Sequence, residues 1–76
     1  MLNHHFELDA RGIKCPLPII RAGKRLTQLN TGDVLKVIST DKGSLGDFDA
    51  FCKQTGNQLL ESSQNENDYE FLIQKV

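Results

Sequence analysis

The sequence predicts an α+β fold, a two-layer α/β sandwich in which two helices cover one face of a four-stranded mixed sheet. First, stretches with helical and strand-like periodicity alternate along the chain in the order βαβαββ. Second, both helical stretches are apolar on one side only, so each is expected to cover a sheet face. Third, the 76 residues suffice for one domain with one small core.

The first half of the chain contains a strand, a helix and a second strand. Phe6–Asp9 alternates apolar and acidic side chains, which predicts a short strand. Apolar residues then recur at three- and four-residue spacing up to Leu29, which predicts an amphipathic helix that begins at Pro16 or Pro18. Val34–Ser39 is rich in β-branched residues and predicts a buried strand.

The second half is expected to contain a helix followed by two strands. Ser44 is positioned to cap a helix whose apolar residues follow helical spacing, and Gly56 is expected to end it. Gln58–Ser62 predicts a third, weaker strand, and Ser63–Asn67 predicts a polar loop. An alternating stretch from Tyr69 to Gln74 predicts the last strand.

Length and composition exclude several classes of protein. Residues 1–76 are interpreted as a single domain, with 38% hydrophobic and 25% charged residues. No apolar run approaches the ~18 residues of a membrane span, and no signal peptide is visible. We therefore expect a cytoplasmic protein with no membrane partner. Two cysteines without a CxxC pair fit neither a disulfide-rich secreted domain nor a zinc ribbon, so both thiols are expected to be free.

We expect neither a cofactor nor a metal. The chain has two histidines, His4 and His5, which are adjacent near the N-terminus. They are interpreted as part of a frayed tail rather than as metal ligands. The six glycines form no phosphate-loop spacing.

The net charge of −1 conceals an asymmetry along the chain. Residues 10–32 contain basic side chains and no acid, whereas residues 41–70 are mainly acidic. Either two solvated faces simply differ in sign, or the basic segment creates a positive potential for an anion or an acidic partner. Basic residues without interleaved aromatic ones are a weak nucleic-acid signal, so no direct nucleic-acid contact is expected. The basic residues are Arg11, Lys14, Arg21, Lys24 and Arg25.

Cys15 is the residue that folding alone does not require. It lies between Lys14 and Pro16 at the predicted strand-to-helix junction, rather than inside an apolar face. Pro16 suits the first helical position, but the helix starts cleanly only at Pro18 if the residue before that proline leaves the α region. A helix N-terminus with Arg11 and Lys14 nearby favours the thiolate, which is the nucleophilic form of cysteine. The alternative is that a cysteine stands beside a proline-rich helix start by chance.

Cys52 is interpreted differently. It lies with Phe48 on the apolar stripe of the second predicted helix, and free cysteine is often buried and inert, so a packing role is expected. The residues at the ends of the first two strands, Asp9 and Asp41, have two interpretations. Their carboxylates either cap nearby backbone donors or contact a partner.

The run Leu8-Asp9-x-x-Gly12-x-x-Cys15-Pro16-x-Pro18 closely resembles the signature of the TusA/SirA-like sulfur-carrier family, whose mark is the Cys-Pro-x-Pro motif. The resemblance extends over almost the whole chain, and the length and the βαβαββ order are also similar to this family. A few positions depart from its usual pattern and leave the cysteine motif intact. They are Lys42, Asp49, Phe51 and Asn57.

The resemblance implies that Cys15 accepts a sulfane sulfur, carries it as a persulfide and relays it to an acceptor protein. It implies a partner of sulfurtransferases rather than a stand-alone enzyme. The implied donors are cysteine desulfurases or rhodanese-type proteins, and the implied acceptors are downstream sulfur-relay proteins. Implied destinations include 2-thiolation of tRNA, molybdenum-cofactor synthesis and sulfur oxidation or thiosulfate use. The residues expected to support Cys15 are Gly12, Pro16, Pro18, Asp9, Lys14 and Arg11.

Two other functions are compatible with the residues. One is a non-catalytic regulatory or protein-interaction module, in which Cys15 only starts a helix. The other is a thiol redox protein that uses Cys15 and Cys52, which requires Cys52 to be exposed near Cys15. A monomer is the default expectation for each of these functions.

Overall fold

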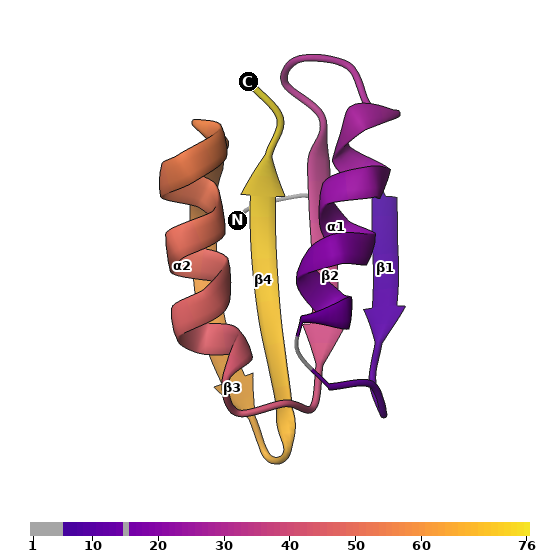
Figure 1. The fold of residues 1–76 in the computed structure, drawn as a ribbon, viewed down its shortest axis with the longest axis vertical. Coiled ribbons are helices and arrows are strands. Elements are labelled where there is room, and N and C mark those ends of the chain that lie inside the picture. The colour runs from indigo at the N-terminus through magenta and orange to yellow at the C-terminus, as the bar shows by residue number, and fades with distance from the viewer. Residues whose placement is uncertain (1–5, 15) are drawn as a thin grey trace.

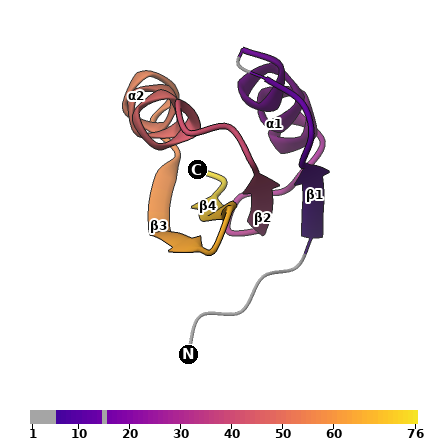
Figure 2. The same ribbon diagram turned by 90° about the horizontal axis from the view of Figure 1, so that it is seen from below.

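The computed structural model describes residues 6–14 and 16–76, and its elements follow the predicted order (Figure 1). The elements are β1 (Phe6–Ala10), α1 (Leu17–Thr27), β2 (Val34–Ser39), α2 (Ser44–Thr55), β3 (Gln58–Asn65) and β4 (Asp68–Gln74). Both helices lie on one face of the sheet, and no described element covers the other, which we call the open face (Figure 2). The predicted α+β sandwich is therefore confirmed.

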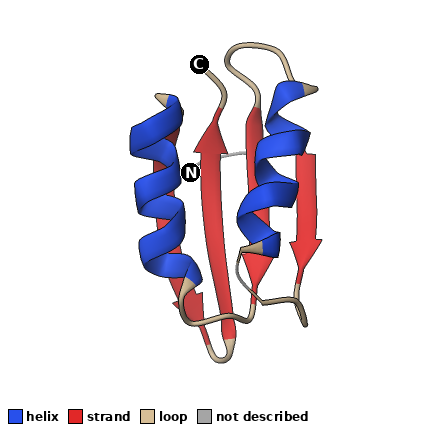
Figure 3. Cartoon of the chain, viewed as in Figure 1, coloured by secondary structure: helices blue, strands red, loops and turns tan. Residues whose placement is uncertain are grey.

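The sheet is mixed and has the order β1-β2-β4-β3. β1 pairs with β2 in parallel, whereas β4 pairs antiparallel with both β2 and β3. Because β1 and β2 run in the same direction, their carboxyl ends lie at one end of the sandwich. Both helices also begin there (Figure 3), so we call this the helix-start end.

The register of the strands places one set of apolar side chains against the helices. Leu8 lies opposite Val37 in the β1–β2 ladder, and Val37 lies opposite Phe71 in the β2–β4 ladder. Since side chains alternate between the two faces of a strand, the residues two positions away face the helices as well. The buried apolar strand residues on this face are Ala10, Leu35, Val37, Tyr69, Phe71 and Ile73.

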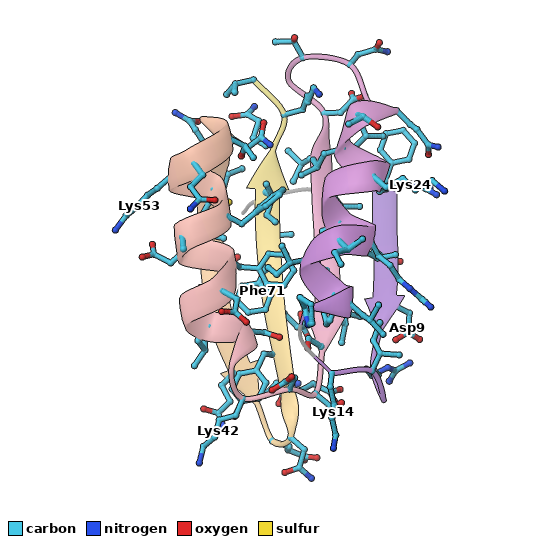
Figure 4. All side chains as sticks on the ribbon, in the orientation of Figure 1. Asp9, Lys14, Lys24, Lys42, Lys53 and Phe71 are labelled. Carbon is cyan, nitrogen blue, oxygen red and sulfur yellow. The ribbon has the colours of Figure 1, made fainter. Side chains whose placement is uncertain are left out.

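An aromatic contact joins the sheet to α2 at the centre of the core. The rings of Phe48 and Phe71 are stacked, with 4.6 Å between their centroids, and both side chains are fully buried. Figure 4 shows Phe71 on β4 between the two helices. Phe51 meets Phe48 edge-on and packs against α1 at Gly23, where an added Cβ would lie 3.4 Å from the Phe51 ring. This glycine therefore lets the helices approach closely.

The first helix is slightly shorter than its periodicity suggests. It begins at Leu17, between the two predicted starts at Pro16 and Pro18; Pro16 takes the cap position and Pro18 lies inside the first turn. Helix α1 ends at Thr27 because the next two amide groups bond three residues back, to the carbonyls of residues 25 and 26. Leu29 still packs into the core beyond this tightened turn.

Two predictions for the second half are corrected. Ser44 is the first residue of α2 rather than its cap, because its hydroxyl is hydrogen-bonded to that of Ser39 inside the core, at 2.8 Å. β3 extends to Asn65 instead of ending at Ser62, because its residues pair with β4 up to a tight turn at Glu66. Backbone pairing thus continues through polar side chains that favour loops. The described helices, of 11 and 12 residues, are too short to cross a membrane.

The stacked aromatic pair generates a stability prediction. Phe71→Ala should lower the free energy of unfolding by about 3–5 kcal/mol, because it removes a fully buried ring and leaves a cavity beneath α2. Ile20→Ala, on the exposed side of α1, should change it by less than about 0.5 kcal/mol. Urea unfolding followed by circular dichroism measures both values. Equal losses for the two variants would contradict this description of the core.

Candidate functional site

The candidate site lies at the helix-start end, where the segment between β1 and α1 passes the turn between β2 and α2. Cys15 itself lies outside the described residues, as do His4 and His5. The residues on both sides of Cys15 are described. We use the term frame for the residues expected to support the cysteine, namely Asp9, Arg11, Gly12, Lys14, Pro16 and Pro18.

On the β1 side, the frame is held by an ion pair and by a bond to β2. The Arg11 guanidinium donates two hydrogen bonds to the carboxylate of Asp9, each 3.0 Å long, and the Arg11 amide donates a third. A second carboxylate, on Asp68 at the start of β4, lies 4.0 Å from Arg11. The next amide, of Gly12, donates to the hydroxyl of Thr40 at 3.0 Å. The segment is therefore tied to its own strand and to the end of β2.

Gly12 has a φ of +81°, in the left-handed region. Glycine adopts this conformation without the steric penalty that a side chain imposes. The turn can therefore reverse the chain directly after β1 and bring it back toward α1. This is the structural basis for the glycine that the motif places three residues before Cys15.

On the helix side, backbone bonds and two prolines define the frame. The amide of Leu17 donates to the carbonyl of Lys14, and the amide of Ile20 donates to that of Pro16, both at 3.0 Å. Neither proline has an N–H group, so Pro16 and Pro18 leave fewer amide donors unsatisfied at the helix start. Pro18 is also buried and anchors the first turn to the core. The first turn of α1, which begins two residues after Cys15 in the sequence, is thereby held in place.

The electrostatics of this helix start favour an anion. α1 has no acidic residue in its first turn and no side-chain cap on its N-terminus. The partial positive charge of the helix N-terminus is therefore not neutralised by its own helix. Lys14 is exposed and directly precedes Cys15, and Arg11 lies in the same segment. A thiolate or a persulfide anion would be stabilised in such surroundings.

The turn between β2 and α2 forms the other wall of the site. The carboxylate of Asp41 accepts a hydrogen bond from the amide of Gly43 at 2.9 Å. The hydroxyl of Ser39 accepts one from the amide of Asp41 and also contacts Ser44. Of the two interpretations of Asp41, this geometry fits the capping of backbone donors. These hydrogen bonds, together with the bond from the Gly12 amide to Thr40, hold the turn beside the Gly12 segment.

Two open cavities flank the frame. One, of about 290 Å³, lies between the two turns and includes the residues directly before Cys15 in the sequence. It is lined by Gly12, Ile13, Lys14, Thr40, Asp41 and Lys42. The other, of about 210 Å³, lies between the helices and includes Pro16, directly after Cys15, together with Ile19 and Phe51. The cysteine is thus preceded and followed in sequence by residues that line different cavities.

Cys52 lies far from this arrangement. It belongs to the last turns of α2, at the end of the helix opposite to its start, and it is only 5% exposed. Burial, with a smaller contribution from Asp49, raises the pKa of its thiol to about 11. The predicted packing role of Cys52 is confirmed, and the exposure that a redox pair with Cys15 requires is not met.

Sequence reasoning missed two residues of the site, Thr40 and Lys42. Both follow β2, whose carboxyl end adjoins that of β1 in a parallel pair. This adjacency is the signal that could have identified them, since ligand sites in parallel α/β units collect at the carboxyl ends of strands. No group of three or more potential metal ligands is present among residues 6–14 and 16–76.

The fold and the frame define a class of protein, the small α+β domains that hold a cysteine-bearing helix start in basic surroundings. The family model for the sulfurtransferase TusA matches residues 6–75. The chain is 58% identical to the sulfur carrier protein TusA of Allochromatium vinosum, over 91% of both chains. It is 52% identical to a putative sulfur carrier protein of Neisseria meningitidis, over 88% of this chain and 90% of that one.

A solved structure supports the same assignment. The SirA-like protein of Desulfitobacterium hafniense superposes with a TM-score of 0.82 at 29% identity, covering 92% of this chain and 96% of that one. The chain therefore belongs to the TusA family, and the predicted resemblance is confirmed.

The Asp9–Arg11 pair makes stability depend on pH. Arg11 lowers the pKa of Asp9 from 3.8 to about 2, first through the side-chain hydrogen bonds and then through the backbone one. Because the folded pKa lies below the unfolded one, Asp9 stabilises the fold above about pH 4, and this contribution disappears between roughly pH 4 and pH 2. The side chain of Asp9 is 58% exposed, so the effect is small and screened by salt.

Asp9→Asn removes this titration and tests the assignment. The urea midpoint of the wild type should fall more steeply from pH 4 to pH 2 than that of the variant, at low ionic strength. Glu61→Gln serves as a control and should follow the wild type, because Glu61 is exposed on β3 and lies outside the frame. If the wild type and Asp9→Asn lost stability in parallel over this range, the described ion pair would not hold the loop in solution.

Proposed function

We propose that this protein is a sulfur carrier that accepts a sulfane sulfur on Cys15 and relays it to an acceptor protein. The observation that supports this most strongly is the match to the TusA family over residues 6–75, a range that contains the complete Cys-Pro-x-Pro motif. The relatives named above are called sulfur carriers, and this chain spans about nine-tenths of their length. The frame described above suits the same role.

The transfer consists of two thiol exchanges. The Cys15 thiolate attacks the terminal sulfur of a donor persulfide, a new S–S bond forms on Cys15, and the donor cysteine leaves as a thiolate. A thiolate of the acceptor then attacks the outer sulfur, and Cys15 leaves in turn. The transferred sulfur keeps its oxidation level, so neither step needs an added oxidant or reductant.

The frame contributes to both steps through charge and access. The positive end of α1, with Lys14, stabilises Cys15 as the attacking thiolate and again as the leaving group, whereas Arg11, paired with Asp9, holds the preceding turn in place. The cavities beside Lys14 and Pro16 are open, so a partner can bring its own cysteine to the carrier. A small domain needs no enclosed pocket for this reaction, because each partner supplies its own active site.

The proposed partners are proteins rather than nucleic acids. A cysteine desulfurase or a rhodanese-type protein is the proposed donor, and a downstream sulfur-relay protein is the proposed acceptor. The 2-thiolation of tRNA, or another sulfur route, would then be reached through the acceptor. The exposed cations of α1 can steer an acidic partner surface toward the helix-start end.

Loading with sulfur tests the proposal directly. The purified protein is incubated with a cysteine desulfurase and cysteine, and its intact mass is measured before and after reduction. The wild type should gain sulfur that dithiothreitol removes, and Cys15→Ser should gain none. Cys52→Ala is the matched control and should load like the wild type, because Cys52 is buried away from the site. Equal loading of Cys15→Ser and the wild type would refute the proposal.

A further inference from the structure

The outer edge of β1 is a second surface that the proposed sulfur transfer does not use. β1 is the edge of the sheet, and within the described part of the chain no strand pairs with its outer side. Its ladder with β2 is regular from Phe6 to Ala10. The opposite edge, β3, has a register shift between Leu59 and Glu61. Such irregularities protect an edge from pairing with another chain, whereas a regular edge is a template for an added strand.

Helix α1 packs above this edge, and its basic side chains line a groove between the helix and β1. The groove, of about 190 Å³, is formed by Leu8 on β1 and by Arg21, Lys24, Arg25 and Gln28 on α1. Figure 4 shows Lys24 on the side of α1 that faces β1. Apolar surface lies below the charges, because Leu8 is only partly buried.

The cations of this groove are not neutralised within the described part of the chain. The ion pairs there join Arg11, Lys36 and Lys53 to acids elsewhere, and none includes a groove residue. The guanidinium of Arg25 lies over the ring of Phe6 instead, 5.8 Å from its centre. This contact holds Arg25 above β1 without consuming its charge. The edge therefore combines free backbone pairing capacity with a row of positive charge.

We propose that this edge binds an acidic, extended segment of a partner protein as an additional strand. The segment would pair with the backbone of β1, and every second side chain would point toward α1, where the cations favour glutamate or aspartate. The intervening side chains would lie on the open face beside Glu7 and Asp9, where further acids are disfavoured. The expected pattern is thus an acidic residue at every second position, with neutral residues between.

Charge also decides against a second copy of this chain as the occupant. Pairing two β1 edges would continue the sheet and place two α1 helices side by side on the same face. Arg21, Lys24 and Arg25 of both copies would then oppose each other, which is unfavourable. An acidic segment meets no such repulsion.

The surface lies close to the site without covering it. β1 ends at Ala10, and the segment that leads to Cys15 follows directly. A partner held along β1 would be anchored beside this segment while the helix-start end stays accessible. The proposal goes beyond sulfur transfer, since binding at the edge needs no sulfur and no Cys15.

The test uses a labelled seven-residue peptide that alternates glutamate with threonine, and fluorescence anisotropy at low salt. The full-length protein should bind it, and Lys24→Glu should weaken binding about fivefold, because a favourable exposed charge contact becomes a repulsive one. Lys53→Glu is the matched control. It makes the same charge change on an exposed position of α2 and should bind like the wild type.

Two altered peptides separate strand addition from simple charge attraction. Methylation of alternate backbone amides should abolish binding, because it removes the pairing with β1. Grouping the glutamates at one end should weaken binding, because the side chains then leave the register of the groove. No binding of the alternating peptide, or equal binding of the methylated peptide, would overturn the proposal. Cys15→Ser should bind normally, which keeps this test independent of sulfur loading.

Discussion

The parallel pairing of β1 with β2 is the constraint on which the site depends. It brings the carboxyl ends of both strands together, so that the amide of Gly12 reaches the hydroxyl of Thr40. The chain must then cross the sheet as α1, and the helix begins beside that same pair of strand ends. The Asp9–Arg11 pair and the hydroxyls of Ser39 and Ser44 hold the two turns in place. The sheet topology therefore defines the helix-start end, and side-chain contacts stabilise it.

The helix layer and the sheet have different roles around this end. The aromatic stack of Phe48 and Phe71 fixes α2 on the sheet, and the contact of Phe51 with Gly23 fixes α1 against α2. This leaves the polar side of α1 free to present its cations to solvent. An open, basic helix start suits the proposed sulfur carrier, which must meet a donor and an acceptor in turn.

Periodicity was sufficient to predict the element order and the burial of Cys52, because these depend on one amphipathic face for each helix. Boundaries were harder. The end of α1 depends on local three-residue hydrogen bonds, and the length of β3 depends on pairing with β4 rather than on its own polar side chains. Ser44 does not cap α2 as predicted, because its hydroxyl bonds to the buried hydroxyl of Ser39, a partner that a linear pattern does not reveal. Asp9 and Gly12 follow from the motif and Arg11 from its positive charge near the helix start, whereas Thr40 and Lys42 require knowledge of which strand ends meet.

We propose that the frame holds Cys15 as a reactive thiolate. The most direct measurement is the rate of iodoacetamide alkylation of each cysteine in the native protein as a function of pH, followed by peptide mass analysis. Cys15 should reach its half-maximal rate at a pH below the free-cysteine pKa of about 8.5. Cys52, whose pKa burial raises to about 11, should stay unmodified and serve as the internal reference. A half-maximal rate for Cys15 at or above the free-cysteine value would contradict the claim.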